Sequence, residues 1–111
     1  MVHISEPDWK VFRQLHQVVV ERFCDKVLAE VQRVISDVSK SHHERYGDVY
    51  GLILDRNKEM AQIIDAYRRS TALFQLGLMH MRGFLAEEEI SRFSAGTRRI
   101  LDNYARAFNV R

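Results

Sequence analysis

Apolar residues recur at helical spacing along most of the chain and predict an all-α fold. Between residues 6 and 38, a first row of apolar side chains at three- to four-residue steps consists of Trp9, Phe12, Leu15, Val19, Phe23 and Val27. A second row alternates steps of four and three residues, as heptads do, and consists of Val20, Cys24, Val27, Val31, Val34 and Val38. This spacing predicts one continuous helix over 6–38, despite the run of three valines at 18–20.

The start and the length of this helix carry further information. Ser5 is placed to cap the helix, with Pro7 in the first turn and Asp8 as the acid that reaches back to the cap. A helix over 6–38 would be about 50 Å long, whereas a compact chain of this size has a radius of gyration of about 13 Å. The helix must therefore kink, or another chain must cover part of its apolar rows, and we favour the second alternative.

A second helix is predicted over 42–66. Ser41 and Glu44 form a capping-box pattern at its start. Its apolar face consists of Tyr46, Val49, Tyr50, Ile53, Met60, Ile64 and Tyr67. Asn57 falls on this face, either as a partly exposed or backbone-bonded amide or as a polar residue that sets the register of a helix interface. Gly47 and Gly51 either permit close helix approach or merely weaken the helix.

Shorter elements are predicted for the remainder. Ser70 is a plausible cap for a third, strongly apolar helix that ends at Gly83 in a left-handed conformation. An acidic helix over 86–93 follows, and Ser94 caps a last helix with the apolar residues Ile100, Leu101, Tyr104 and Phe108. On that helix, the four-residue spacing of Arg98, Asp102 and Arg106 allows them to pair. We expect a single domain over 1–111: a long antiparallel helical hairpin (6–38 and 42–66) with a bundle-like cap of three short helices (70–108).

Composition adds few constraints to this picture. The chain has 111 residues, of which 46% are hydrophobic and 29% charged, values typical of a folded globular protein. The single cysteine, Cys24, excludes an intramolecular disulfide. The N-terminal residues show no secretory signal, and no apolar run reaches the ~18 residues of a membrane span. We therefore expect a cytoplasmic protein that makes no use of a membrane.

The residues that could carry chemistry are few and scattered. No phosphate-binding glycine loop or nucleophile motif is present, and we expect no catalytic residues and no cofactor. His42, His43, Glu44 and Asp48 are the densest group of potential metal ligands, but they lack the spacing of known zinc or carboxylate sites. A solvated helix N-terminus explains them better than a metal site does. His16 and His80 are expected to be packed or rim histidines.

A nucleic-acid role is the alternative that charge suggests. The net charge of +2 comes entirely from residues 71–111, which hold six basic and four acidic groups. The candidate contact residues are Arg98, Arg99, Arg106 and Arg111, yet Glu87, Glu88 and Glu89 precede them and would repel phosphates. A solvated face that pairs with Asp102 and the acidic helix is the simpler explanation of these arginines. An adaptor would present Arg68, Arg69, Arg98 and Arg99 to a protein partner.

The overlong first helix leads to the main functional expectation. We expect a non-catalytic interaction or regulatory protein, a homodimeric adaptor that also binds another protein. Its dimer interface is expected to include Val20, Val27, Val31, Val34, Tyr50 and Ile53. A helical DNA-binding regulator is the alternative, and a metal-binding bundle is a more distant one.

Overall fold

The computed structural model describes residues 3–109, with side chains as far as residue 107, and contains helices and turns but no strand in this range. The elements are α1 (Glu6–Ile35), α2 (His42–Met60), the π-helical turn η1 (Ala61–Asp65), the 3-10 turn η2 (Arg69–Thr71), α3 (Ala72–Met81), α4 (Glu87–Ile90) and α5 (Ala95–Asn109). The predicted all-α class is confirmed. The side chain of Phe108, assigned above to the last apolar row, lies outside the described part.

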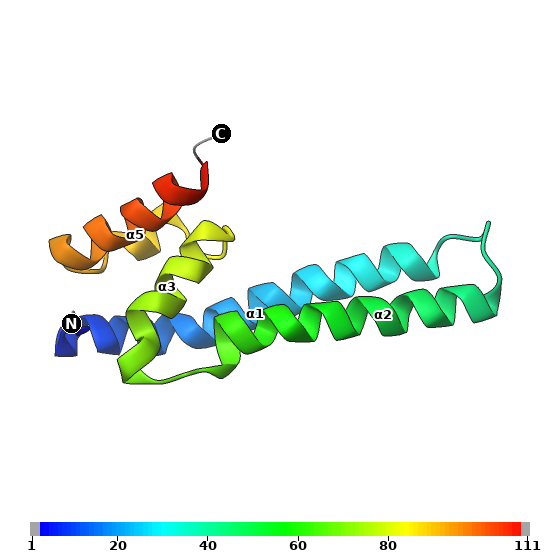
Figure 1. The fold of residues 1–111 in the computed structure, drawn as a ribbon, viewed down its shortest axis with the longest axis horizontal. Coiled ribbons are helices and arrows are strands. Elements are labelled where there is room, and N and C mark those ends of the chain that lie inside the picture. The colour runs from blue at the N-terminus through cyan, green and yellow to red at the C-terminus, as the bar shows by residue number, and fades with distance from the viewer. Residues whose placement is uncertain (1–2, 110–111) are drawn as a thin grey trace.

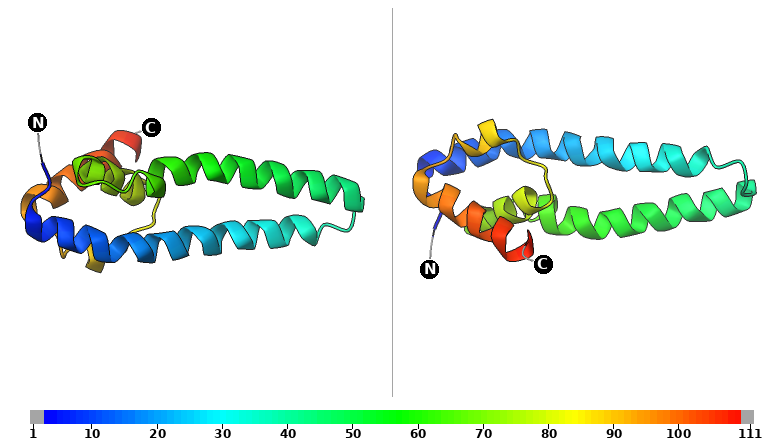
Figure 2. Two further views of the ribbon diagram at one scale, coloured as in Figure 1. Left: turned by 90° about the horizontal axis from the view of Figure 1, so that it is seen from below. Right: turned by 90° about the horizontal axis from the view of Figure 1, so that it is seen from above.

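The molecule is elongated, with principal extents of 52 × 30 × 25 Å and a radius of gyration of 16.7 Å. Helices α1 and α2 lie side by side and run in opposite directions, while α3, α4 and α5 gather at one end of this pair (Figures 1 and 2). We call that end the base, and the part of the pair that projects beyond it, residues 28–54, the arm. None of the helices described is both long and apolar enough to cross a bilayer.

Helix α1 begins as predicted, but Asp8 has a different role from the one expected. The Ser5 hydroxyl accepts a hydrogen bond from the Asp8 amide (3.3 Å). The Asp8 carboxylate does not reach back to Ser5; it accepts hydrogen bonds from the Ser94 amide (2.9 Å), the Ser94 hydroxyl (2.6 Å) and the Thr97 hydroxyl (2.6 Å). Asp8 therefore fastens the start of α1 to the start of α5, across more than eighty residues of sequence.

The environment of Asp8 keeps it ionised. Its side chain is buried, and burial by itself would raise the pKa of the carboxyl group. The hydrogen bonds from Ser94 and Thr97 outweigh that effect and hold the pKa below its usual value. Ser94 in turn accepts a bond from the Thr97 amide (3.4 Å), so the predicted cap of the last helix is present.

Helix α1 ends at Ile35, three residues earlier than predicted, so Val38 is wrongly assigned to its apolar row. Val38 lies in the connecting loop and is 87% exposed. The polar residues before it stop the helix: the Ser36 hydroxyl donates to the Gln32 carbonyl (2.8 Å), and Asp37 accepts from both the amide and the hydroxyl of Ser39. Such short side chains compete with helical backbone bonds.

Helix α2 starts with the predicted capping box, in which Ser41 and Glu44 bond reciprocally. Its far end widens into the π-turn η1, whose carbonyl groups find partners on other elements. His16 Nε2 on α1 donates to the Ile64 carbonyl (2.9 Å), and Gln75 Nε2 on α3 donates to that of Ile63 (3.4 Å). The Thr71 hydroxyl donates to the Ala66 carbonyl (2.9 Å). These three side chains close the turn that returns the chain to the base.

The predicted cap Ser70 is wrong. Neither η2 nor α3 has a side-chain cap at its start, and Ser70 lies inside the 3-10 turn. The other end of α3 is as predicted: Gly83 has φ +78°, its amide bonds to the His80 carbonyl, and the Phe84 amide bonds to the Met79 carbonyl. These two bonds define a Schellman motif, which directs Phe84 back into the core.

Helix α3 is central to the base, packing against α1, η1 and α5. Gly77 allows the contact with α5, because a Cβ atom there would lie 2.6 Å from the Tyr104 ring. Gly47 and Gly51, by contrast, have nothing within 4 Å of an added Cβ, so they permit no close approach within the chain. The core of the base consists mainly of Phe12, Leu15, Val19, Phe23, Ile63, Leu76, Met79, Phe93 and Leu101.

A buried ion pair holds α4 against α1. Helix α4 is a single turn, shorter than the predicted 86–93, and Glu89 on it is 6% exposed. The Glu89 carboxylate receives both terminal nitrogens of Arg22 at 2.7 Å and also the Ala86 amide (2.8 Å). The hydrogen bonds from Arg22 are the main cause that lowers the pKa of Glu89. Arg22 also donates to the Phe84 carbonyl (2.8 Å), so one side chain joins α1 to the Gly83 turn.

Candidate interaction surface on the helical arm

The arm contains no buried residue. Every position from 28 to 54 is exposed or only partly buried, and α2 has no buried residue over all its 19 residues. Helices of soluble proteins normally gain most of their stability by burying an apolar face. The arm carries such faces, but the chain itself covers them only where α1 and α2 touch each other.

Burial falls steadily along one row of α1 as it leaves the base. Leu15, Val19 and Phe23 are at most 2% exposed, and Val27 is 8% exposed. Further out, Val31 is partly buried and Ile35 is 48% exposed. Each four-residue step turns by about 40° around the helix, so the row moves away from the covered face as well as away from the base, and its residues remain apolar beyond both.

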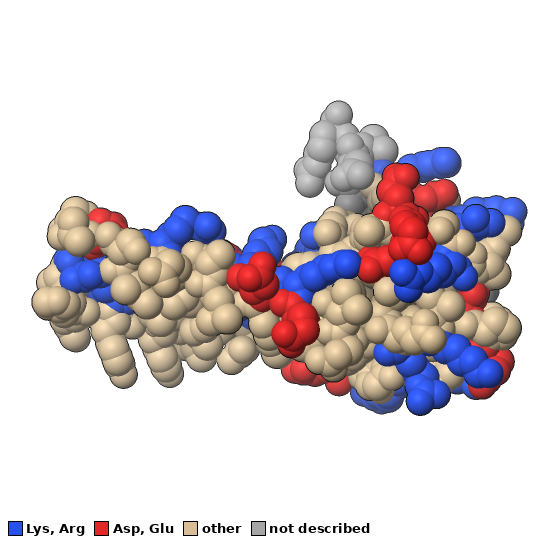
Figure 3. Space-filling view, turned by 180° about the vertical axis from the view of Figure 1, so that it is seen from behind, with Lys and Arg blue, Asp and Glu red and all other residues tan. Residues whose placement is uncertain are grey.

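Large apolar side chains are exposed along the whole arm, on both helices and the loop. They are Leu28, Ile35, Val38, Tyr46, Tyr50, Ile53 and Leu54. In Figure 3 the arm, on the left, shows mostly uncharged atoms, and uncharged side chains project from its lower edge. The base in the same view carries charged residues of both signs. On this face, the arm shows fewer charged side chains than the base does.

A groove of about 280 Å³ lies between the two helices where the arm meets the base. It is lined by Phe23, Cys24, Val27 and Leu28 of α1 and by Ile53, Arg56, Asn57 and Met60 of α2. Its lining is apolar except for the Asn57 amide and the Arg56 guanidinium. Asn57 is exposed in the single chain. This agrees with the first of the two alternatives predicted from the sequence, an exposed amide.

The charge of Arg56 is already compensated within the chain. Its guanidinium makes two hydrogen bonds to Glu30 (2.8 and 3.0 Å) and one to Glu59 (2.8 Å). The bonds from Arg56 are the main cause that lowers the pKa of Glu30. Glu59 also accepts from Arg82 at the end of α3 (2.9 Å), which ties the arm to the base. The groove therefore contains no isolated charge that a partner would have to neutralise.

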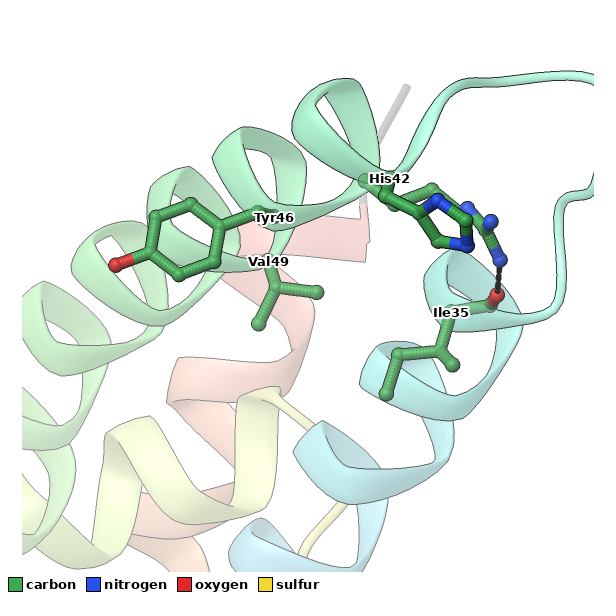
Figure 4. Close-up of a pocket in the computed structure, with 5 residues that line it drawn as sticks. Ile35, His42, Tyr46 and Val49 are labelled. Atoms are coloured by element: carbon green, nitrogen blue, oxygen red, sulfur yellow. Dashed lines mark hydrogen bonds between the residues drawn. The ribbon is translucent and has the colours of Figure 1, made fainter.

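A second hollow of about 310 Å³ lies at the tip of the arm, lined by Ile35, His42, Arg45, Tyr46 and Val49. Figure 4 shows Ile35 on α1 lying across from Val49 on α2. The Arg45 guanidinium caps the last turn of α1 by donating to the Ile35 carbonyl (2.7 Å), the bond dashed in Figure 4. Arg45 thereby fixes the spacing of the two helices at the tip.

The residues predicted to form a dimer interface fall into two groups. Val27 is buried in the core, and Val20, Val31 and Val34 are partly buried, with Val20 and Val31 packed against that core. Tyr50 and Ile53 are exposed on the arm, at 63% and 36%. The valines are therefore at least partly covered by their own chain, whereas the exposed α2 residues are available to another molecule.

The candidate metal ligands serve local structure instead. Glu44 completes the capping box, and the backbone hydrogen bond from Ser41 lowers its pKa. Asp48 pairs with Lys40 (2.7 Å) across the loop, while His42 and His43 are exposed in the first turn of α2. Within residues 3–109, no three His, Cys, Asp or Glu side chains come close enough to hold a metal ion.

The candidate arginines lie on the base, on two separate elements. Arg68 and Arg69 lie at the 3-10 turn, where Arg69 pairs with Glu6 (2.6 Å). Arg98, Arg99 and Arg106 are exposed on α5, and Arg111 lies outside the described residues. No ion pair found in the described part joins Asp102 to Arg98 or Arg106, so the pairing predicted from their spacing is not present.

The histidines are packed or rim residues, as predicted. His16 is partly buried and stacks on Tyr67, with ring centroids 4.1 Å apart and planes at 18°. His16 therefore holds the segment that follows η1 against α1. His80 is partly buried on α3, and its Nδ1 atom has no hydrogen-bond partner among the residues described.

Two polar contacts that shape the base were not predicted from the sequence. They join Asp8 to Ser94 and Thr97, and Arg22 to Glu89. Both join residues more than sixty positions apart, and the spacing of charges along one helix contains no signal for them. The largely apolar groove, the exposed tyrosines and the compensated charge of Arg56 together suit contact with another apolar protein surface. Comparisons with models of protein families, with curated proteins and with solved structures gave no match.

Proposed function

We propose that this chain is a non-catalytic, cytoplasmic interaction protein that acts as a homodimeric adaptor, with the arms of two copies covering each other. The single observation that carries the proposal is the uncovered arm: residues 28–54 expose seven large apolar side chains and bury none. Contiguous apolar surface of this kind marks protein contact sites in soluble proteins. The base, with its own core, holds the arm in place.

The size of the apolar surface suits a dimer. The seven exposed side chains offer roughly 400–700 Å² of apolar area, judged from their exposure and the typical areas of aromatic and aliphatic side chains. A standard interface buries about 800 Å² on each partner, including a polar rim. Polar neighbours of these residues on both helices supply that rim. The arm can therefore provide an interface of ordinary size without help from the base.

A second copy of the chain is a chemically suitable occupant. A two-fold interface places the same surface on both sides, so any uncompensated charge would oppose itself. The groove avoids this problem, because its one charged residue, Arg56, is paired with Glu30 and Glu59. Asn57 adds one polar group to an otherwise apolar surface, the arrangement that fixes register in helical interfaces. Pairing of two arms would form a four-helix bundle.

The adaptor role follows from what such a dimer displays. Pairing through the arms leaves both bases free, each presenting exposed arginines at Arg68 on the turn and at Arg98 and Arg99 on α5. A dimer presents each of these groups of arginines twice and can hold two copies of an acidic partner. The nucleic-acid alternative would have to use α5 with Arg98, Arg99 and Arg106, because α4, the helix after the Gly83 turn, is only four residues long and cannot serve as a recognition helix.

The substitution Ile53→Lys is expected to weaken the dimer at least tenfold. Ile53 lines the groove, and a lysine there would place like charges opposite each other in an apolar interface. Sedimentation equilibrium over a range of concentrations measures the effect. The matched control is Val18→Lys, since Val18 is 37% exposed against 36% for Ile53 but lies outside the arm.

The comparison of the two variants decides the proposal. Both should show the same helical circular dichroism as the unaltered chain. If the Val18→Lys and Ile53→Lys proteins have equal dimer dissociation constants, the arm is not the interface.

A further inference from the structure

The shape of the arm also determines how two copies fit together. Resting on the proposed dimer, we infer that the arms pair antiparallel, about a two-fold axis that crosses near Leu28 and Ile53. In this arrangement Tyr46 at the tip of one arm occupies the groove of the partner, beside Cys24 and Asn57. The two bases then lie at opposite ends of one four-helix rod.

The exposed tyrosines and the groove occupy different ends of the arm. The most exposed aromatic side chains, Tyr46 at 75% and Tyr50 at 63%, belong to the half of α2 nearer the tip. The groove lies at the other end, where the arm meets the base. A parallel pair would set tyrosine against tyrosine and groove against groove. An antiparallel pair places the tyrosine end of each arm against the groove of the other. Because the interface is two-fold, this contact occurs twice.

The spacing along the helices agrees with this pairing. Arg45 bonds to the carbonyl of Ile35, so the tip residues of α2 lie level with the end of α1. Cys24 lies eleven residues before Ile35, which corresponds to about 17 Å along the helix. Leu28 lies between these two levels, close to their midpoint. A two-fold axis there brings the partner's tip onto the groove of this chain.

Chemical matching supports the same contact. A buried tyrosine hydroxyl needs a hydrogen-bond partner, and the groove offers the Asn57 amide oxygen as an acceptor. Leu28, 65% exposed beside the groove, faces the partner's tip in turn. There the hollow lined by Ile35 and Val49 can receive it (Figure 4). Each projecting side chain thus has a hollow of suitable character on the other copy.

Thiol cross-linking tests the orientation, because Cys24 is the one cysteine of the sequence and lines the groove. In the Tyr46→Cys protein, mild oxidation should give a dimer-sized product that joins position 46 to Cys24 of the other copy, as shown by peptide mapping. Adding Cys24→Ser should abolish that product. The unaltered chain should form no disulfide between its two Cys24 residues, since they would lie on opposite sides of the axis.

A second variant keeps Tyr46 and is used if the Tyr46→Cys substitution itself prevents dimerisation. Gly47→Cys keeps Tyr46, has open space around its Cβ atom, and should be joined to Cys24 by a short bismaleimide. Rapid formation of a Cys24–Cys24 disulfide in the unaltered chain would overturn the antiparallel arrangement. So would the failure of both variants to cross-link while sedimentation still shows a dimer. A monomer in sedimentation would instead remove the proposed function, and this inference with it.

Discussion

Replacing Asp8 with alanine is expected to lower the free energy of unfolding by about 3 kcal/mol. The substitution removes three hydrogen bonds to an ionised acceptor and leaves the donors of Ser94 and of the buried Thr97 without that partner. Urea unfolding followed by circular dichroism at a fixed protein concentration measures the change. The control is Ser5→Ala, which removes only the α1 cap and should cost about 1 kcal/mol.

The effect of Asp8 should depend on pH in a defined direction. Its pKa is lower in the folded protein than its ordinary value of 3.8, so the unfolded chain takes up the proton first as the pH falls. The contribution of Asp8 is therefore complete at neutral pH and is lost below about pH 4. The difference between the unaltered chain and Asp8→Ala should shrink between pH 7 and pH 3. A difference that grows over this range would contradict the role given to the carboxylate.

Replacing Arg22 with methionine is expected to cost about 2 kcal/mol, because it leaves the buried Glu89 carboxylate without its main partner. The value is below that of a fully buried pair, since the Arg22 side chain is 40% exposed and water can reach the site. Urea unfolding at pH 7 again provides the measurement. Glu88→Gln is the matched control on the same short helix. It breaks only the exposed pair with Arg92 and should change stability by less than about 0.5 kcal/mol.

Local signals in the sequence identified most of the helices and several of their ends. The capping boxes and caps work over three residues, and Ser5, Ser41 and Ser94 bond as their spacing predicts. Gly83 adopts the left-handed conformation for the same reason, because the requirement is purely local. The end of α1 is the exception, since apolar spacing alone extended it to Val38. The bonding of Ser36, Asp37 and Ser39 decided that boundary.

The contacts that depend on tertiary structure could not be predicted. Asp8 looked like a local capping acid, and only the arrival of α5 gives its carboxylate stronger partners. Arg22 was one of several surface charges, and Glu89 one of three acids, until folding brings these two together. Gly77 seemed no different from Gly47, yet it alone lies under an aromatic ring. The extra length of the first helix was visible, but the sequence does not show which faces of the arm stay uncovered.

The mass of the unaltered chain in solution tests the central claim most directly. Sedimentation equilibrium at micromolar concentration should give twice the chain mass of 13.1 kDa. Hydrogen exchange in the same samples should show slowing in residues 28–54 as concentration rises, because pairing protects the arm. A single species of 13.1 kDa across that range, with exchange in the arm unchanged, would show that the exposed apolar residues do not bring two copies together.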